Sequence, residues 1–262
     1  MIKNLGVQLY TIRDFMKSAD DIRAAFKRLK ELGYTEAQTA GSGEITYEEL
    51  GDIAREFGIA IQGTHYDINI MENDFEKAIR DHKAMGTTNC GIGGCWELNT
   101  PEETKAFIKK ANAIADKLYE HGMKFTYHNH SHEFKKIDGN TSAWDMLVEG
   151  LNPEKTSFVL DTYWVANAGA DPIYWIKKLA GRIDILHLKD KGYTTSRHKT
   201  QDNEIILEIT EIGSGNLNWD GIIKTAEETG VKYYCVEQDR NFLSGNPFES
   251  LDVSAEFLKK YM

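Results

Sequence analysis

Short apolar or β-branched runs alternate along this chain with longer stretches in which apolar residues recur at helical spacing. A glycine stands between the helical stretch and the following run, as in "LKELGYTEAQ" and "LYEHGMKFTY". Glycine just past a helix supplies the left-handed residue that closes it, and the run behind it is typical of a buried strand. The junction recurs at Gly33, Gly58, Gly86, Gly122, Gly150, Gly181 and Gly230.

The number and spacing of these junctions indicate the fold. Seven junctions, together with an opening strand "LGVQLY" that no helix precedes, predict eight strands. Successive junctions lie 25 to 49 residues apart, which suits strand–helix units and not hairpins. The sequence therefore predicts an α/β protein, a single-domain (β/α)8 TIM barrel over residues 1–262. A doubly wound open sheet is the alternative, disfavoured because no G-x-G-x-x-G follows the first strand.

The longest interval, 49 residues, contains a polar stretch over 192–216 that follows the seventh predicted strand. A β-like patch covers 205–212, and the next helix is expected to be capped by Asn218 or Asp220. A loop of this length beyond a strand end is uncommon unless it is functional. We expect either a rim over a pocket or a subunit contact. Its segment "EIGSGN" suits either a phosphate or a plain turn.

Composition narrows the class of partner. The net charge of −10 and the pI near 5.3 argue against nucleic acid or an anionic membrane as the main partner, since both require a basic footprint. Cys90, Cys95 and Cys235 form no C-x-x-C pair, and no segment has the features of a signal peptide or a membrane span. These features lead us to expect a reduced, cytoplasmic protein.

Polar side chains gather at the predicted strand ends, where active sites of such barrels lie. Side chains two apart on a strand share a face, so His128 and His130 are expected to point the same way, as are His187 and Lys189. The set also includes one residue just beyond the fifth strand, Glu133. Its remaining members are Gln8, Tyr10, His65, Asp161 and Glu237.

Several of these groups end apolar runs such as "FVLD", "DILH" and "YYCVE", which would place them at the rim of a packed interior. A buried carboxylate is costly without a partner, so the groups should be paired or bind a metal. Two carboxylates and one or two imidazoles from adjacent strands match a divalent cation, Mn²⁺, Zn²⁺, Co²⁺ or Mg²⁺. Taken singly, each has a plainer interpretation as a helix cap or a hydrogen-bonded core group.

Six motifs, in this order, cover essentially the whole chain: "GVQLYTIRD", "TYHNHSHEF", "LDTYW", "HLKD", "EIGSGNLNW" and "VEQD". Together they resemble the xylose isomerase-like TIM barrels, the sugar phosphate isomerase/epimerase family. In its ketose epimerases Glu, Asp, His and Glu hold a metal, and the two Glu residues exchange a proton with the substrate. The resemblance implies Asp161, His187 and Glu237 as ligands. The first Glu is replaced by His128, so either His128 binds the metal or Glu133 supplies the carboxylate.

The resemblance implies a metal-dependent isomerase or epimerase that acts on a keto-sugar through an enediolate. Glu237 or a histidine of the 128–130 pair would remove the proton, and Lys189, His65 or Glu133 would act second. Substrate contacts are expected from Gln8, Tyr10, Arg13, His65, His130 and Trp164. The "YHNH…EF" variant resembles members that act on inositol-type or 3-keto sugars, so a dehydratase or lyase is the alternative.

Two further classes stay open. Apurinic-site endonucleases share this barrel, but they require more ligands than can be placed here, and the acidic charge disfavours a phosphate backbone. A non-catalytic carbohydrate-binding barrel is also consistent with the missing Glu, since fold alone does not establish catalysis. The expected partner is a small sugar, with no nucleic acid and no membrane, and the family suggests a homo-oligomer.

Overall fold

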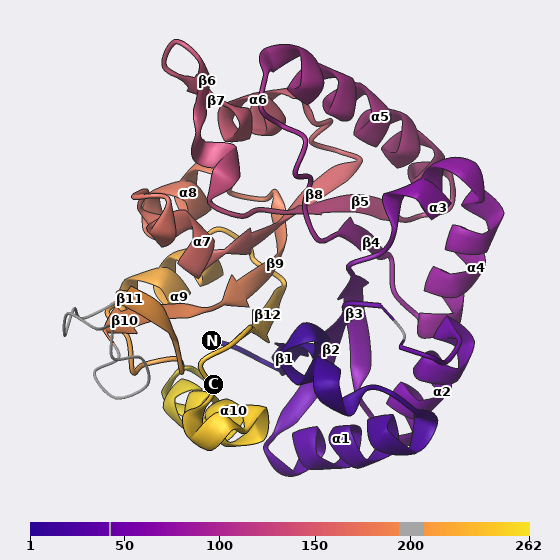
Figure 1. Ribbon diagram of the computed structural model, residues 1–262, viewed down its shortest axis with the longest axis vertical. Helices are drawn as coiled ribbons and strands as arrows, with labels where there is room; N and C mark the ends of the chain where they lie inside the picture. Colours follow the sequence, from indigo (N-terminus) through magenta and orange to yellow (C-terminus); the bar gives the residue numbers. More distant parts are fainter. Residues whose placement is uncertain (42, 194–206) are drawn as a thin grey trace, which may run out of the picture.

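The computed structural model describes residues 1–41, 43–193 and 207–262. At its centre is an eight-stranded parallel sheet in which neighbours along the chain are neighbours in space (Figure 1). Its strands, in chain order, are β1 Leu5–Gln8, β2 Tyr34–Thr39, β3 Ala60–Thr64, β4 Asn89–Ile92, β5 Lys124–His128, β8 Thr156–Asp161, β9 Ile183–Leu188 and β12 Tyr233–Val236.

The sheet closes on itself. β12 pairs in parallel with β1. β3 and β4 meet where the backbone N–H of Tyr66 donates to the carbonyl of Gly91 at 2.7 Å and Nδ2 of Asn89 donates to the carbonyl of Gln62 at 2.8 Å. Closure removes the open edges that a doubly wound sheet would have. The prediction of a (β/α)8 TIM barrel is confirmed.

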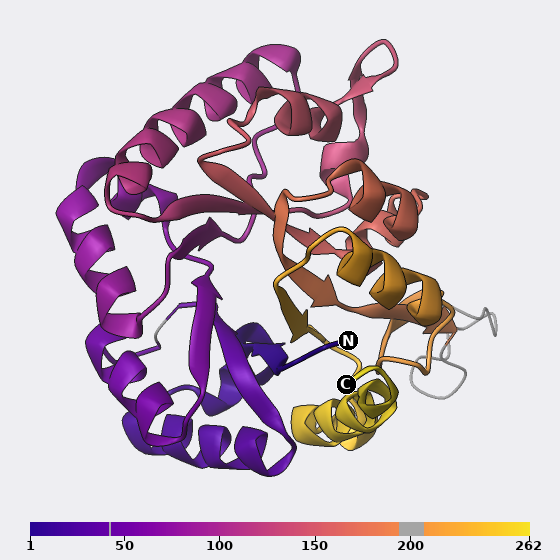
Figure 2. The ribbon, with the colours of Figure 1, turned by 180° about the vertical axis from the view of Figure 1, so that it is seen from behind.

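Helices between the strands form the outer layer, and the two views show them surrounding the sheet (Figures 1 and 2). Many begin at a side-chain cap; Thr100, for example, forms a capping box with Glu103. The main helices are α1 Ala19–Glu31, α2 Tyr47–Glu56, α4 Phe75–Met85, α5 Pro101–Glu120, α6 Ala143–Gly150, α8 Pro172–Lys178, α9 Trp219–Glu228 and α10 Pro247–Leu258. Shorter helices, η1 Leu9–Phe15, α3 Ile68–Asn73, η2 His132–Phe134 and α7 Thr162–Asn167, follow β1, β3, β5 and β8.

Six of the seven predicted glycine junctions are confirmed, with φ between 63° and 91° at each glycine. The prediction is wrong at Gly150, which is the last residue of α6 and has no positive φ. A Cβ there would lie 2.9 Å from the side chain of Ile108, so glycine is required by the approach of α5 and not by a left-handed turn. The sixth strand still follows, as β8.

Two apolar regions stabilise the barrel. Most buried apolar side chains belong to one large cluster, whose members come from the strands and the helices alike. A small second cluster of Val159, Ile185 and Cys235 comes from β8, β9 and β12. Glycine permits close contact here, because a Cβ on Gly63 would lie 2.7 Å from Cδ1 of Ile185.

The stretch after β9 forms a hairpin, in which β10 Asp190–Tyr193 pairs antiparallel with β11 Leu207–Thr210. Residues 194–206, which include most of the predicted rim or subunit contact, lie outside the described residues. The expected β-like patch agrees with β11 over 207–210, and Asn218 is the cap of α9.

The carboxylate of Asp190 fills the turn that contains "EIGSGN". It accepts hydrogen bonds from the backbone N–H groups of Lys191, Gly213, Gly215 and Leu217 and from Nε1 of Trp219, at 2.6 to 3.3 Å. A Cβ on Gly215 would lie 2.2 Å from Oδ1 of Asp190. Of the two uses considered for this segment, the plain turn is the one observed, since the donors that a phosphate would need are already engaged.

The chain ends meet on one side of the barrel (Figures 1 and 2), where the N–H of Ile2 donates to the carbonyl of Tyr261 at 2.8 Å. Within the described ranges, no helix has the length and apolar character needed to cross a membrane.

Candidate metal centre

A cavity of about 830 Å³ opens at the carboxyl ends of the strands. Eight of the predicted site residues line it: Tyr10, Arg13, His65, His128, His130, Trp164, Lys189 and Glu237. Asp161 and His187 are fully buried and contact the lining residues His128, Lys189 and Glu237. A polar group at the base of a concave pocket is typical of small-molecule sites.

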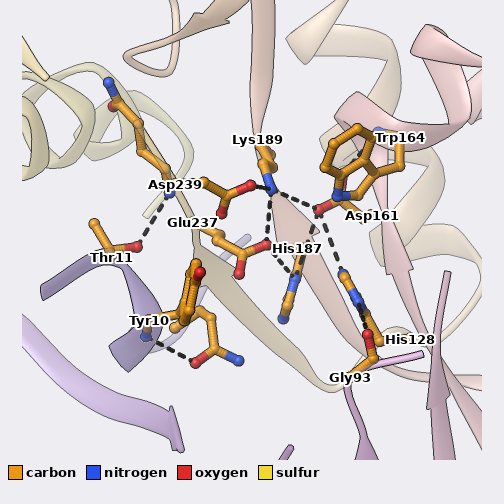
Figure 3. A network of polar contacts seen from close by, with 12 residues as sticks. Tyr10, Thr11, Gly93, His128, Asp161, Trp164, His187, Lys189, Glu237 and Asp239 are labelled. Carbon is orange, nitrogen blue, oxygen red and sulfur yellow. Dashed lines mark hydrogen bonds and ion pairs between the residues drawn. The ribbon is translucent and has the colours of Figure 1, made fainter. Parts of the chain in front are cut away.

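Four of these side chains converge from four different strand ends (Figure 3). Potential ligand atoms of His128, Asp161, His187 and Glu237 all lie within 4.8 Å of one another. Oδ2 of Asp161 is 3.5 Å from Nε2 of His128 and 3.7 Å from Nδ1 of His187. Nδ1 of His187 is 3.1 Å from Oε2 of Glu237. These separations are close to those between neighbouring ligands of a tetrahedral ion with bonds of about 2.1 Å.

Asp161 has two roles, one for each oxygen. Oδ1 accepts from the N–H of Trp164 at 2.8 Å and caps α7. Oδ2 faces the cluster, and among the described residues neither Oδ2 nor Nε2 of His128 has a hydrogen-bond partner. Two buried ligand atoms left unsatisfied at the middle of the group are what a cation site requires, so the residues fit a divalent metal.

A carbonyl sets the orientation of His128. Its Nδ1 lies 3.3 Å from the carbonyl oxygen of Gly93, which can only accept, so the ring proton belongs on Nδ1. Nε2 is then a lone-pair nitrogen directed at Asp161. A neutral imidazole held in this way by an outer acceptor is the usual form of a histidine ligand.

Lys189 lies at the end of β9 and is only 1% exposed. Its Nζ lies 3.1 Å from Oε2 of Glu237, 2.6 Å from Oδ2 of Asp239 and 3.7 Å from Oδ2 of Asp161. Burial opposes its charge, but these carboxylates outweigh burial and hold the pKa of Lys189 above its usual value.

The charged groups of the cluster shift one another's pKa values so that each charged form is favoured. Burial alone would raise the pKa of Asp161, but Lys189, His128 and His187 lower it to about 2. The pKa of Glu237 likewise lies well below its usual value despite burial, because Lys189 and His187 favour its anion. Burial disfavours the His187 imidazolium, yet Glu237 and Asp161 raise the pKa of that ring to about 9. Positive charge, from a proton or a metal, is therefore stabilised between the two carboxylates.

Glu133 lies outside this cluster. Its buried carboxylate accepts from the hydroxyl of Tyr127 at 2.9 Å and from the N–H of His130 at 2.8 Å, and it does not line the cavity. Of the two alternatives for the missing family Glu, the geometry places His128 in the cluster. Glu133, His130 and His132 form a second group close enough to hold a cation. There Nε2 of His132 already donates to the carbonyl of Cys95 at 2.8 Å.

Some of the predicted substrate residues line the cavity and others do not. Gln8, the last residue of β1, does not line the cavity. Its side-chain amide instead forms a hydrogen bond to Gln38 at 2.8 Å. Tyr10 lies at the mouth under the guanidinium of Arg13, 4.3 Å from the ring centroid. The His65 ring lies 4.8 Å from that of His128, and burial lowers the pKa of His65 well below its usual value.

An aromatic wall borders the cavity on the side of β5. Trp164 lies 5.2 Å from the ring of His130, and Trp96 lies 4.7 Å from the same ring. Burial, the largest cause, lowers the pKa of His130 to about 3, so this ring is neutral at physiological pH. Trp96 is 67% exposed and lines the mouth, where its ring is accessible to a molecule in the cavity.

Sequence reasoning missed three residues of the site: Gln38, Trp96 and Asp239. Gln38 was the polar residue near the end of the second strand, and Asp239 shares a face with Glu237 by the two-residue rule, so both could have been found. Trp96 stands in a loop with no such signal.

Comparison with known proteins agrees with this geometry. The family described as xylose isomerase-like TIM barrel matches residues 26–261. An inosose dehydratase of Geobacillus thermodenitrificans is 25% identical over 168 residues, which are 62% of this chain and 55% of that protein. One of Clostridium tetani is 27% identical over 186 residues, 68% of this chain and 61% of that protein. Each match thus spans under two thirds of the relative's length.

Solved structures share the fold. A sugar phosphate isomerase/epimerase of Parabacteroides distasonis superposes with a TM-score of 0.83 at 23% identity, covering 99% of this chain and 94% of that one. The IOLI protein with a bound zinc atom gives 0.72 at 14% identity, covering 99% of each chain. With eight parallel strands in a closed barrel and a family match over nearly its whole length, the chain belongs to the xylose isomerase-like TIM barrel family.

Proposed function

We propose that this protein is a divalent-metal-dependent lyase that removes water from a cyclic polyol ketone of the inosose class. The observation that carries the proposal is the pair of unsatisfied buried atoms, Oδ2 of Asp161 and Nε2 of His128, in a group of four ligands beside a cavity. The relatives with the printed activity of inosose dehydratase support the substrate class.

His128, Asp161, His187 and Glu237 would hold the ion. Bound there, it would polarise the ketone and its neighbouring hydroxyl and so make the adjacent carbon acidic. The mixed oxygen and nitrogen ligand set suits Mn²⁺, Zn²⁺ or Co²⁺ better than Mg²⁺, which favours oxygen.

The isomerase or epimerase function, which the sequence led us to expect first, has less support than the dehydratase named as its alternative. Two-base epimerisation needs proton-exchanging groups on opposite faces of one carbon. Among the described residues of the cluster, the only carboxylate that lines the cavity is Glu237, at the end of β12. The position three strands further round the barrel carries His128, whose Nε2 is directed into the cluster.

Elimination needs one base and one acid, and Glu237 and Lys189, which both line the cavity, would supply them. The carboxylate of Glu237 would take the proton from the carbon next to the ketone. The ammonium group of Lys189 would give a proton to the hydroxyl on the following carbon, which departs as water while the carbon–carbon double bond forms. Their 3.1 Å separation lets Glu237 return its proton to Lys189. Acid and base on one side imply a syn elimination.

The test is to incubate metal-loaded protein with an inosose or with an open-chain ketohexose in deuterated water. NMR should show loss of water from the inosose and no new diastereomer. A deuterium-labelled diastereomer would instead establish epimerisation. Binding without turnover, unaffected by chelation, would favour a carbohydrate-binding barrel, and cleavage of an abasic duplex in the same buffer would favour a nuclease.

A further inference from the structure

We infer that Gln38 is a positioning residue that fixes the tautomer of His187, so that this ring presents Nδ1 to the metal while His128 presents Nε2. The inference rests on the proposed metal site. It assigns a role to Gln38, on β2, which does not line the cavity.

The assignment begins at a backbone amide. The N–H of Tyr10 can only donate, and it lies 3.1 Å from the oxygen of the Gln8 side chain. This contact identifies Oε1 of Gln8, so the Gln8 amide nitrogen must be the atom that faces Gln38. That nitrogen donates to Oε1 of Gln38 at 2.8 Å. The orientation of both glutamine amides therefore follows from one backbone group.

The same oxygen of Gln38 lies 2.5 Å from Nε2 of His187. An amide oxygen accepts and does not donate, so Nε2 of His187 carries a proton in the charged ring and also in the neutral ring that would bind a metal. Nδ1 is left as the lone-pair nitrogen, and it faces Oε2 of Glu237 at 3.1 Å and Oδ2 of Asp161 at 3.7 Å. A lone pair opposite two carboxylates is repulsive unless a cation or a proton lies between them.

The tautomers of the two proposed histidine ligands are thus fixed by different kinds of acceptor. His128 is held by the backbone carbonyl of Gly93, at 3.3 Å from Nδ1, and so turns Nε2 inward. His187 is held by a side chain and turns Nδ1 inward. Nε2 of Gln38 is buried and has no hydrogen-bond partner within residues 1–41, 43–193 and 207–262. The orientation of this amide is therefore imposed by the two donors that converge on Oε1.

The experiment uses full-length protein with ¹⁵N-labelled histidine and ¹¹³Cd²⁺ as the probe ion. Expected are cadmium couplings to Nδ1 of His187 and to Nε2 of His128, with a slowly exchanging proton on Nε2 of His187. Coupling through Nε2 of His187 would overturn the inference and leave the metal site intact. Absence of bound cadmium would overturn the metal site and the inference together.

Variants test the role of Gln38 without relying on turnover. Gln38→Leu removes the acceptor and should weaken Cd²⁺ and Zn²⁺ binding about 10- to 100-fold. Gln38→Glu keeps an oxygen acceptor and should retain the Nδ1 coupling. The matched control is Gln62→Leu, a half-buried glutamine on β3 that is not in contact with His187. Unchanged affinity and coupling in the folded Gln38→Leu variant would contradict the role.

Discussion

Oδ2 of Asp161 and Nε2 of His128 lie 3.5 Å apart in the buried base of the cavity, and neither atom has a hydrogen-bond partner in the part of the chain that the structure describes. Asp161→Asn keeps the Oδ1 cap of α7 and replaces the charged Oδ2 with a neutral amide that can satisfy His128. We expect this variant to lose bound metal. Metal at about 100 times its Kd should stabilise the wild type by about 2.7 kcal/mol and the variant by far less.

The measurement is elemental analysis of purified protein together with urea unfolding, each with and without chelator. Asp67→Asn is the matched control, because Asp67 lines the same cavity but lies outside the four-residue cluster. Equal metal content in Asp161→Asn and wild type would show that the cluster is not the binding site.

Lys189 and Glu237 have separable roles in the proposed elimination. Lys189→Met removes the acid but leaves the carboxylate that takes the proton, so solvent deuterium should still enter the unreacted substrate. Product formation should fall about 10²- to 10⁴-fold, the usual contribution of a positioned acid. NMR in deuterated water follows both quantities at once.

Lys232→Met provides the comparison, because this lysine is half exposed and pairs with Asp184 away from the cavity. If Lys189→Met lowered exchange and elimination by the same factor, Lys189 would act in binding and not as the acid.

Much of the fold and part of the site were predictable because both depend on local rules. Strand ends in a closed parallel barrel must meet at one rim, so Asp161, His187 and Glu237 could be brought together without any distance information. His128 was expected at the same rim, at the end of the fifth strand, but whether it or Glu133 completes the group was left open. The sequence could not predict which of these polar atoms would form hydrogen bonds outside the cluster. Glu133 is directed to Tyr127 by the turn of η2, a contact without a sequence pattern.

Gln8 shows the same limit. Its position at the end of β1 predicted a substrate contact, but the chain turns at once into η1 and the Tyr10 N–H engages its side chain. Gly150 shows that a glycine after a helical pattern can have either of two structural causes. Helix closure and close helix contact both favour glycine, and only the packing of Ile108 distinguishes them.

Asp190 gathers five donors and holds the turn between β11 and α9. Asp190→Asn puts an amide N–H₂ against donors and leaves buried N–H groups unsatisfied. The free energy of unfolding should fall by about 3 kcal/mol, since hydrogen bonds to a charged group are the stronger kind. Urea unfolding measures the loss, and Asp252→Asn, exposed on α10, should change it by less than about 0.5 kcal/mol. A small loss at Asp190 would mean that the turn is held by other contacts.

His82 links the folded state to pH at a place remote from the metal cluster. Its Nδ1 donates to the carbonyl of Ala78 at 2.7 Å, so Nε2 accepts from the hydroxyl of Thr64 at 2.9 Å. Oγ1 of Thr64 in turn accepts from the N–H of Gly91, which joins β3 to β4. Burial lowers the pKa of His82, although Ala78 and Asp81 oppose the shift.

Because the folded pKa lies below that of the unfolded chain, the unfolded state binds more protons as the pH falls. Stability from neutral His82 is therefore complete above about pH 6.5 and is lost below it, by up to about 1.4 kcal/mol per pH unit. His82→Gln should be less stable at pH 8 but should lose less on acidification to pH 5. Urea unfolding of both proteins, with a chelator present, measures how the free energy of unfolding changes with pH in each. The other histidines contribute equally to both proteins, so the difference between the two profiles is due to His82. Parallel pH profiles would show that His82 is protonated as readily in the folded state as in the unfolded chain.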